Sequence, residues 1–384
     1  MAESPERPVV ACFCATFLKP EMLHIYRQIT ALKRWRPIVI TRKRENQFPF
    51  EPVFELKKPR THFIRRFWYR KLLGSPWQIS RAETDTLMRM LNHQEAKVLH
   101  VYFGHIAIQL LPLMRAWARP SIVSFHGADV LVDMEKPKHR DRTRAMLDAA
   151  RLVLVRSESL QRAVAELGCE MHNIRIHRTG IPLEQFPFVE RAWPADGEWR
   201  LIQAGRLVPK KGLATTLRAF AIFRETFPGA RLTIAGDGPL LRELETLARE
   251  VRINDSVTFA GFLSQPELRD LLYKSHLFLH PSETGSDGNQ EGVPNSMLEA
   301  MATGLPVFAT THGGIPEAIE DNVSGVLVPE GDHASLARAL LTAATEPGRL
   351  AEISRAARDA VIAKFDQREQ TRVLESLYSE AARV

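Results

Sequence analysis

A pair of glutamates, Glu291 and Glu299, brackets a segment that is typical of a tight loop followed by a helix. Pro294 suits the first helical turn, and Gly304 suits the position just past the helix end. We therefore expect Glu291 in the loop and Glu299 one to two turns into the helix. The backbone N–H groups at the start of such a helix have no helical partner and bind phosphate well. A phosphate site flanked by two carboxylates predicts a ligand with hydroxyl groups on both sides of its phosphates, such as a nucleotide-sugar.

A cationic loop follows the strand expected at residues 200–204. Gly205 permits a sharp turn, Arg206 and Lys211 flank the loop, and Gly212 permits a close backbone approach before the next helix. Arginine holds a phosphate through two hydrogen bonds, and lysine supplies a point charge. Together the two cations could neutralise a diphosphate without a metal. The alternative is a solvated basic turn.

Other candidate residues also follow strand-like runs. Gly236 and Gly238 form a second glycine-rich turn, which is either a wall of a nucleotide pocket or simply the start of a helix. His126 stands at a strand end where a ligand can be reached, although it could equally cap the next segment. The double glycine at 313–314 fits a tight turn or ligand contact. Residues 287–290 lie on a polar loop that is mobile, faces a sugar, or both.

The sequence predicts no metal site. It contains no Asp-x-Asp triplet, and His276 and His280, despite their helical ligand spacing, lie in an apolar strand-like run. We expect no metal and no other cofactor, because a nucleotide-sugar would be a substrate.

The composition is that of a folded protein with a basic balance. The chain has 384 residues, 45% apolar and 25% charged, and a formal net charge of +7. This length suggests two domains or one large one, and the charge favours an anionic partner such as a phosphorylated ligand, an anionic membrane or nucleic acid. The basic residues are too scattered to form a nucleic-acid-binding surface, except at 57–71.

Three cysteines, with Cys12 and Cys14 too close for an unstrained bridge, indicate reduced thiols. The first residues lack a secretory signal pattern and no run is long enough to span a bilayer, so we expect a cytoplasmic protein.

Strand-like runs alternate with helical patterns along most of the chain, which predicts parallel sheets covered on both faces. The expected strands are residues 9–13, 38–41, 98–101, 122–125, 152–155, 174–177, 200–204, 231–235, 257–260, 277–280, 307–309 and 325–328.

The predicted fold is α/β, with two Rossmann-like, doubly wound domains facing a central cleft. Residues 1–180 form the first domain, the proline-rich residues 181–198 a linker, and residues 199–365 the second domain, followed by a helix over 366–384. In such sheets, ligands bind at the carboxyl ends of the strands.

The segment 62–73 is a basic amphipathic pattern. Wound as a helix, it places its apolar side chains on one face and its arginines elsewhere: Phe63, Ile64, Phe67, Trp68 and Leu72 against Arg65, Arg66 and Arg70. This pattern predicts peripheral contact with the anionic inner face of a membrane, or else a core-packed helix with a basic outer face.

The motifs of residues 199–330, and the order in which they follow one another, resemble those of retaining glycosyltransferases of the GT-B fold, in the large group often called family 4. The matching motifs are Gly205-Arg206…Lys211-Gly212, Gly236-Asp237-Gly238-Pro239, Glu291-Gly292…Glu299, Gly304-x-Pro306, Gly313-Gly314-Ile-Pro316-Glu317 and Ser324-Gly325.

The resemblance implies a role for each matching position. Arg206 and Lys211 would bind the donor diphosphate, Glu299 would accept hydrogen bonds from the ribose, and Glu291 would contact the donor sugar. His126 would lie near the transferred sugar, and the last helix would cross back over the first domain. The remaining donor-binding residues would be Gly205, Gly236, Gly238, Gly292, Val293, Pro294 and Asn295.

The function implied is transfer of a sugar, with retention of configuration, from a nucleotide-diphosphate-sugar to a glycan or lipid-linked acceptor in cell-surface polysaccharide or lipopolysaccharide biosynthesis. The alternatives are a sugar-nucleotide epimerase or a phosphorylase on the same fold, or a nucleotide-sugar-binding protein without activity. The sequence departs from the family pattern at residues 14–21, which contain no glycine where many relatives have a glycine-rich loop. Lys19 or Glu21 could replace the backbone contacts of that loop.

Overall fold

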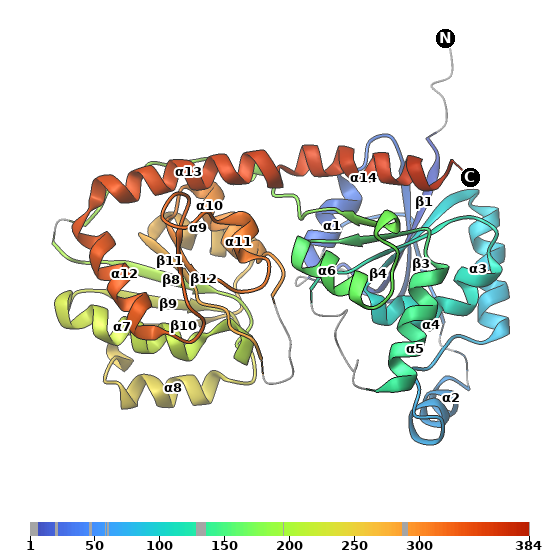
Figure 1. Ribbon diagram of the computed structural model, residues 1–384, viewed down its shortest axis with the longest axis horizontal. Helices are drawn as coiled ribbons and strands as arrows, with labels where there is room; N and C mark the ends of the chain where they lie inside the picture. Colours follow the sequence, from blue (N-terminus) through green and yellow to red (C-terminus); the bar gives the residue numbers. More distant parts are fainter. Residues whose placement is uncertain are drawn as a thin grey trace, which may run out of the picture. The chain divides into compact units, whose positions relative to one another are not determined.

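The computed structural model describes residues 7–19, 22–45, 48–57, 59, 61–127, 136–194, 196–285 and 291–383. The chain forms two compact units (Figure 1). The first unit comprises Met1–Gly180 and Gln367–Val384, and the second comprises Ile181–Asp366. The polar loop at 287–290 and Glu21 lie outside the described residues.

The first unit is built on a seven-stranded sheet with the order β3-β2-β1-β4-β5-β6-β7, in which every pair is parallel. Its strands are β1 (Val9–Phe17), β2 (Arg36–Arg44), β3 (Val53–Glu55), β4 (Ala96–Tyr102), β5 (Ser121–Ser124), β6 (Leu152–Val155) and β7 (Ile174–Ile176). Its helices are α1 (Leu23–Thr30), α2 (His62–Phe67), α3 (Arg81–His93), α4 (Gly104–Ala116), α5 (Pro137–Ala149), α6 (Glu158–Glu166) and α14 (Gln367–Ala381), and a π-helical turn, η2 (Trp68–Leu72), continues α2.

Both faces of this sheet are covered. Along β6, Val153 and Val155 belong to one hydrophobic core, and Leu152 and Leu154 belong to the core on the other face. The last helix, α14, covers the second of these faces with buried side chains that include Tyr378, whose hydroxyl lies 2.7 Å from Nδ1 of His100 on β4. This double cover explains why β6 is apolar in every position rather than in alternate ones.

The first strand is longer than predicted. The sequence analysis ended it at residue 13, whereas β1 continues to Phe17 and stays paired with β2 as far as the Phe17–Arg44 register. Cys14–Phe17, expected as the start of a loop, are therefore strand, because a long parallel neighbour supplies their backbone partners.

The second unit contains a six-stranded parallel sheet with the order β10-β9-β8-β11-β12-β13. Its strands are β8 (Arg200–Ala204), β9 (Arg231–Ala235), β10 (Val257–Gly261), β11 (Leu277–His280), β12 (Val307–Thr310) and β13 (Val326–Val328). Its helices are α7 (Leu213–Thr226), α8 (Leu241–Glu250), α9 (Gln265–Lys274), α10 (Asn295–Thr303), α11 (Ile315–Ala318), α12 (His333–Thr345) and α13 (Pro347–Phe365).

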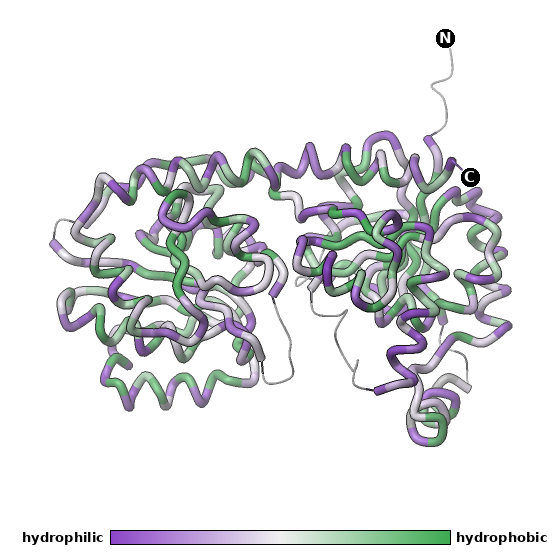
Figure 2. The backbone as a smooth tube through the Cα atoms, viewed as in Figure 1, coloured by the Kyte–Doolittle hydropathy of each residue, from purple (hydrophilic) through white to green (hydrophobic). Residues whose placement is uncertain are grey.

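Helices flank this sheet on both faces as well. Leu277 and Leu279 of β11 pack with residues of α7, α8 and α12, whereas Phe278 packs with residues of α9, α10 and α13. The central strands of both units are mainly hydrophobic, while the flanking helices mix hydrophobic and hydrophilic residues (Figure 2). Among the described residues, no helix is both long and apolar enough to cross a bilayer.

Residues 181–198, expected to form a linker, are counted with the second unit. Ile181 and Phe186 are buried in its core, and the guanidinium of Arg191 donates hydrogen bonds to the carbonyl oxygen of Tyr273 at 2.7 Å and to Oγ1 of Thr303 at 2.9 Å. This segment is therefore fixed to the second unit by both apolar and polar contacts.

Candidate functional site

The neighbouring strands β8, β9 and β10 of the second unit end at one edge of its sheet, where backbone hydrogen bonds join them. The N–H of Gly205 donates to the carbonyl oxygen of Ala235 at 2.9 Å, and the N–H of Gly236 donates to that of Gly261 at 2.7 Å. A Cβ atom on Gly236 would lie 1.9 Å from the carbonyl oxygen of Gly205, so the two turns approach this closely only with glycine at 236. Gly238 lies in the same turn as Gly236, as the sequence indicated.

The loop after β8 brings two lysines to this edge. A short 3-10 turn, Pro209–Lys211, is fixed by a hydrogen bond of 2.7 Å from Nε2 of Gln203 to the carbonyl oxygen of Lys211. Gly212 then starts α7 with φ of +60°, and a Cβ atom there would lie 1.7 Å from the carbonyl oxygen of Pro281. Glycine at 212 is thus required both by the backbone angle and by the neighbouring strand end.

The two lysines converge on Glu291. Nζ of Lys211 contacts Oε2 of Glu291, and Nζ of Lys210 lies 3.1 Å from Oε1. Only 10% of the Glu291 side chain is exposed. Burial alone would raise the pKa of this carboxyl group, but the charges of Lys211 and Lys210 outweigh it and lower the pKa to about 2. Glu291 is therefore ionised at neutral pH and pairs with both ammonium groups.

A buried histidine holds the backbone of Glu291. The N–H of Glu291 donates to Nε2 of His312 at 2.9 Å, and Nδ1 of His312 lies 2.7 Å from Oε1 of Glu330. Because Nε2 accepts, the imidazole is neutral and its proton lies on Nδ1, which donates to Glu330. The N–H of Gly314 also reaches the carbonyl oxygen of Glu291, at 3.4 Å. The double-glycine turn predicted at 313–314 thus lies against the loop that carries Glu291.

The helix that was predicted to follow the Glu291 loop and to contain Glu299 is α10. Pro294 precedes its first residue, and Gly304 ends it in the left-handed conformation with φ of +84°. Oγ of Ser296 donates to the carbonyl oxygen of Ala204 at 2.8 Å, which joins the helix start to the end of β8. The N-terminal N–H groups of α10 therefore lie at the same sheet edge as the cationic loop. The backbone of Gly292, Val293 and Asn295 belongs to this junction.

Glu299 is the fifth residue of α10, just over one turn from its start. It is 4% exposed, and one of its carboxylate oxygens accepts a hydrogen bond of 2.8 Å from Nε2 of Gln265 on α9. Arg206, by contrast, is exposed, and its guanidinium makes no hydrogen bond or ion pair with the part of the chain that the structure describes. The edge therefore combines a solvent-facing arginine, two lysines, a helix start and two carboxylates.

His126, the remaining predicted site residue, belongs to the first unit. Nη2 of Arg156 lies 3.2 Å from its Nδ1, and Oγ of Ser124 lies 3.0 Å from its Nε2. Because the guanidinium can only donate, the proton of His126 lies on Nε2, which donates it in a hydrogen bond to Oγ of Ser124. Burial, and then the charge of Arg156, lower the pKa of His126 well below its usual value. The imidazole is neutral at physiological pH.

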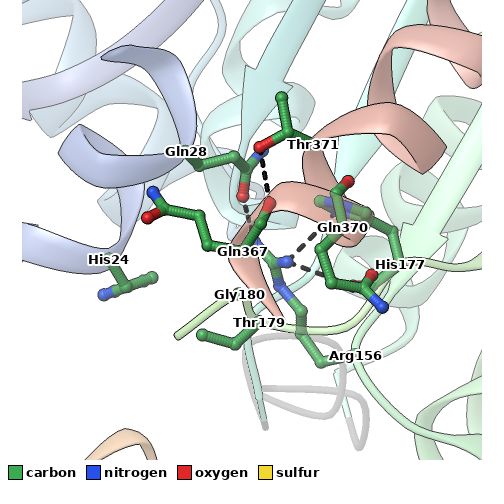
Figure 3. Close-up of a pocket in the computed structure, with 9 residues that line it drawn as sticks. All are labelled: His24, Gln28, Arg156, His177, Thr179, Gly180, Gln367, Gln370 and Thr371. Carbon is green, nitrogen blue, oxygen red and sulfur yellow. Dashed lines mark hydrogen bonds between the residues drawn. The ribbon is translucent and has the colours of Figure 1, made fainter. Parts of the chain in front are cut away.

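Arg156 also lines a small pocket beside the last helix (Figure 3). Its Nη2 donates to Oε1 of Gln28 at 2.7 Å, and its Nη1 donates to the carbonyl oxygen of His177 at 3.1 Å. Nε2 of His177 in turn lies 3.1 Å from the carbonyl oxygen of Gln370 on α14. The pocket is lined by His24, Gln28, Arg156, His177, Thr179, Gly180, Gln367, Gln370 and Thr371. The sequence carried no pattern that singled out Arg156.

Two known families match the chain. Residues 23–185 match "Glycosyltransferase Family 4", and residues 187–360 match "Glycosyl transferases group 1". The amylovoran biosynthesis glycosyltransferase AmsK of Erwinia amylovora is 33% identical over 288 residues, which are 73% of this chain and 70% of AmsK. The chain belongs to the group 1 glycosyltransferases.

A further sequence relative and two solved structures are also similar to this glycosyltransferase. The putative colanic acid biosynthesis glycosyltransferase WcaL of Escherichia coli K12 is 34% identical over 257 residues, 66% of this chain and 62% of WcaL. HepE of Anabaena, solved in complex with UDP, superimposes with a TM-score of 0.75 at 18% identity over 97% of this chain and 100% of HepE. Sucrose-phosphate synthase of Thermosynechococcus elongatus gives 0.77 at 19% identity over 97% and 99%. These likenesses show the GT-B fold that the sequence predicted.

Proposed function

We propose that this glycosyltransferase moves a sugar from a nucleotide-diphosphate-sugar to a hydroxyl group of a glycan or lipid-linked acceptor, with retention of configuration. The observation that carries the proposal is the pairing of Lys210 and Lys211 with Glu291 at the sheet edge where α10 begins, on the same loop as the exposed Arg206. Relatives named for amylovoran and colanic acid biosynthesis support the proposed role in cell-surface polysaccharide or lipopolysaccharide assembly. HepE structures with UDP and UDP-glucose support the proposed nucleotide-diphosphate-sugar donor.

The charges of the site suit a diphosphate. Arg206, Lys210 and Lys211 carry three positive charges, and Glu291 and Glu299 carry two negative ones, so the site has a net positive charge that favours an anionic group. Without a ligand, Glu291 pairs with both lysines; with the donor bound, the diphosphate would share them. The carboxylate of Glu291 would then accept hydrogen bonds from the sugar. Glu299, held by Gln265, would accept them from the ribose.

In the proposed reaction, the bond between the anomeric carbon and the phosphate oxygen breaks while the acceptor oxygen bonds to the same face of that carbon. The acceptor proton passes to an oxygen of the departing diphosphate. Arg206 and the two lysines stabilise the negative charge that develops on that diphosphate. Because these cations can supply the charge that a metal ion would otherwise bring, we expect transfer without an added metal.

His126 would contact the transferred sugar through hydrogen bonds rather than as an acid. Its neutral state follows from burial and from the neighbouring Arg156. We further propose a cytoplasmic location, which the three unpaired, buried cysteines Cys12, Cys14 and Cys169 support.

Thermal unfolding with a panel of nucleoside diphosphates and nucleotide-sugars, with and without EDTA, tests donor binding. At a ligand concentration of 100 times Kd, binding adds about 2.7 kcal/mol, or about 5 to 10 °C for a unit of this size. We expect one base to give this shift, EDTA to leave it unchanged, and R206A or E299A to lose most of it. Absence of a shift with every nucleotide would contradict the proposed donor site, and loss of the shift in EDTA would contradict metal independence.

Transfer itself is tested by following release of the nucleoside diphosphate with candidate acceptors. R206A should lower kcat about 100-fold or more without lowering the melting temperature, because its guanidinium is exposed. A normal shift with no transfer to any acceptor would favour a binding protein without activity, and conversion of the donor into another sugar-nucleotide would favour an epimerase.

A further inference from the structure

The strongest feature outside the donor site is an apolar surface on α2 and η2 in the first unit. Five large apolar side chains are exposed there: Phe63 by 80%, Ile64 by 68%, Phe67 by 55%, Trp68 by 52% and Leu72 by 64%. We call these five residues the α2–η2 apolar face. They are half of the exposed large apolar side chains found among the described residues, gathered within ten positions of the chain.

The α2–η2 apolar face is exposed to solvent, although the helix that carries it is attached to the first unit by several contacts. Tyr69 packs against the core of the first unit, and the guanidinium of Arg65 donates to Oε2 of Glu83 at 3.0 Å and to the carbonyl oxygen of Gln78 at 2.8 Å. A core-packed helix with a basic outer face, one of the two interpretations of the sequence, would bury the apolar side chains instead. The basic and aromatic side chains Arg65 and Tyr69 hold the helix in place and leave the apolar face exposed.

The surroundings of the face are strongly basic. Between Leu56 and Ala82 the chain has eight lysines and arginines and no aspartate or glutamate. Arg66 and Lys71 are exposed on the helix itself. Nζ of Lys138 donates to the carbonyl oxygen of Leu73 at 2.6 Å and so brings the basic start of α5 beside the end of η2. Figure 1 shows α2 next to this end of α5, where Lys136, Lys138 and Arg140 are also exposed.

We propose that the α2–η2 apolar face inserts into the interfacial layer of a lipid bilayer with anionic headgroups. Exposed aromatic and aliphatic side chains on a short helix, flanked by cations, match a helix that lies in the plane of such a surface. The cations of α2, η2 and α5 would lie at the headgroup level, where each contributes a favourable interaction with anionic lipid. Pairing with a second copy of the chain fits less well, because it would bring two strongly basic surfaces together. The inference uses none of the donor-site residues.

Vesicle flotation of the full chain without donor or acceptor tests this surface. We expect binding to vesicles that contain phosphatidylglycerol, and binding at least about tenfold weaker to phosphatidylcholine alone or at high salt. The double variant F63S/W68S should weaken binding at least about tenfold, because it removes two of the largest inserting side chains. The matched control is M171S/I362S, which alters two exposed apolar side chains outside the face, and it should bind like the parent.

A second pair of variants isolates the charges. R66E/K71E should weaken binding about 25-fold or more, since each cation near an anionic surface accounts for about fivefold. Its control, R242E/R249E, reverses two exposed arginines on α8 and should bind like the parent. All these side chains are exposed, so circular dichroism and the nucleotide-induced thermal shift should not change.

Three results would overturn the proposal. One is a parent protein that does not float with anionic vesicles, and another is equal flotation of F63S/W68S and the parent. The third is a dimer in sedimentation experiments that F63S/W68S converts to a monomer without any lipid binding, which would make the face a contact between copies. A protein that binds vesicles but no nucleotide would leave the lipid surface standing and remove the proposed donor site.

Discussion

Replacing Glu291 with glutamine removes the carboxylate that pairs with Lys210 and Lys211 and keeps the size of the side chain. The variant leaves two ammonium groups close together without their counter-charge. We expect E291Q to lower the free energy of unfolding. The size of this decrease should depend on pH, because folding lowers the pKa of Glu291.

The magnitude follows from that pKa. Folding lowers the pKa of the Glu291 carboxyl from 4.5 to about 2, against the opposing effect of burial. A lowered pKa stabilises the fold fully above the unfolded value and loses this effect as the pH falls through the folded value. At about 1.4 kcal/mol per unit, the ionised carboxylate contributes about 3 kcal/mol at pH 7 and about 1 kcal/mol near pH 3.

Urea unfolding of the parent and E291Q at a series of pH values measures this difference directly. Carboxylates other than Glu291 titrate in both proteins, so their effects cancel in the comparison. The difference in unfolding free energy should shrink by about 2 kcal/mol between pH 7 and pH 3. The control E250Q alters an exposed glutamate on α8 and should give only a small difference in unfolding free energy. A difference for E291Q that is the same at both pH values would refute the account of the lysine–glutamate cluster.

Two further predictions concern contacts that the sequence did not reveal. Q265A should weaken nucleotide binding about 5- to 10-fold in titration calorimetry while leaving the fold intact, because Gln265 orients the carboxylate of Glu299 through one hydrogen bond; unchanged affinity would mean that Glu299 needs no such support. Y378F should lower the free energy of unfolding by about 1 to 3 kcal/mol in urea, because it leaves Nδ1 of the buried His100 without the hydroxyl that it contacts; a stability equal to that of the parent would show that water or another group replaces the hydroxyl.

Much of the fold could be predicted because parallel strands that are covered on both faces carry short apolar runs rather than an alternating pattern. The bounds of β6, β8, β9 and β11 match the predicted strands. The strand that the sequence analysis missed, β3, is a three-residue edge strand whose residues are only partly buried or exposed, so no apolar run marks it. Strand ends were less predictable, as β1 shows, because a neighbouring strand can extend a pairing that the local sequence does not indicate.

In the candidate site, local patterns were informative and distant contacts were not. The order Glu-Gly-Val-Pro predicted a loop followed by a helix, and α10 lies there. The sequence analysis assigned Lys211 to the diphosphate but did not anticipate that Lys211 and Lys210 would pair with Glu291, some 80 positions away. The link from Glu330 through His312 to Glu291 was also missed, because it depends on which strand ends are adjacent in the sheet.

The attachment of α14 to the first unit has a consequence for the order of events during synthesis. The second unit is continuous, and its ends meet where the N–H of Ile181 donates to the carbonyl oxygen of Phe365 at 2.7 Å, so it can fold as soon as it has left the ribosome. The first unit is made earlier, but α1 covers only part of one face of its sheet, and the rest is uncovered until Leu374 and Tyr378 arrive. At about 5 to 20 residues per second, translation of the second unit alone takes about 10 to 40 s. During this interval the N-terminal part of the nascent chain exposes part of an apolar sheet face, so a ribosome that stalls within the second unit would present a chaperone substrate rather than a finished domain.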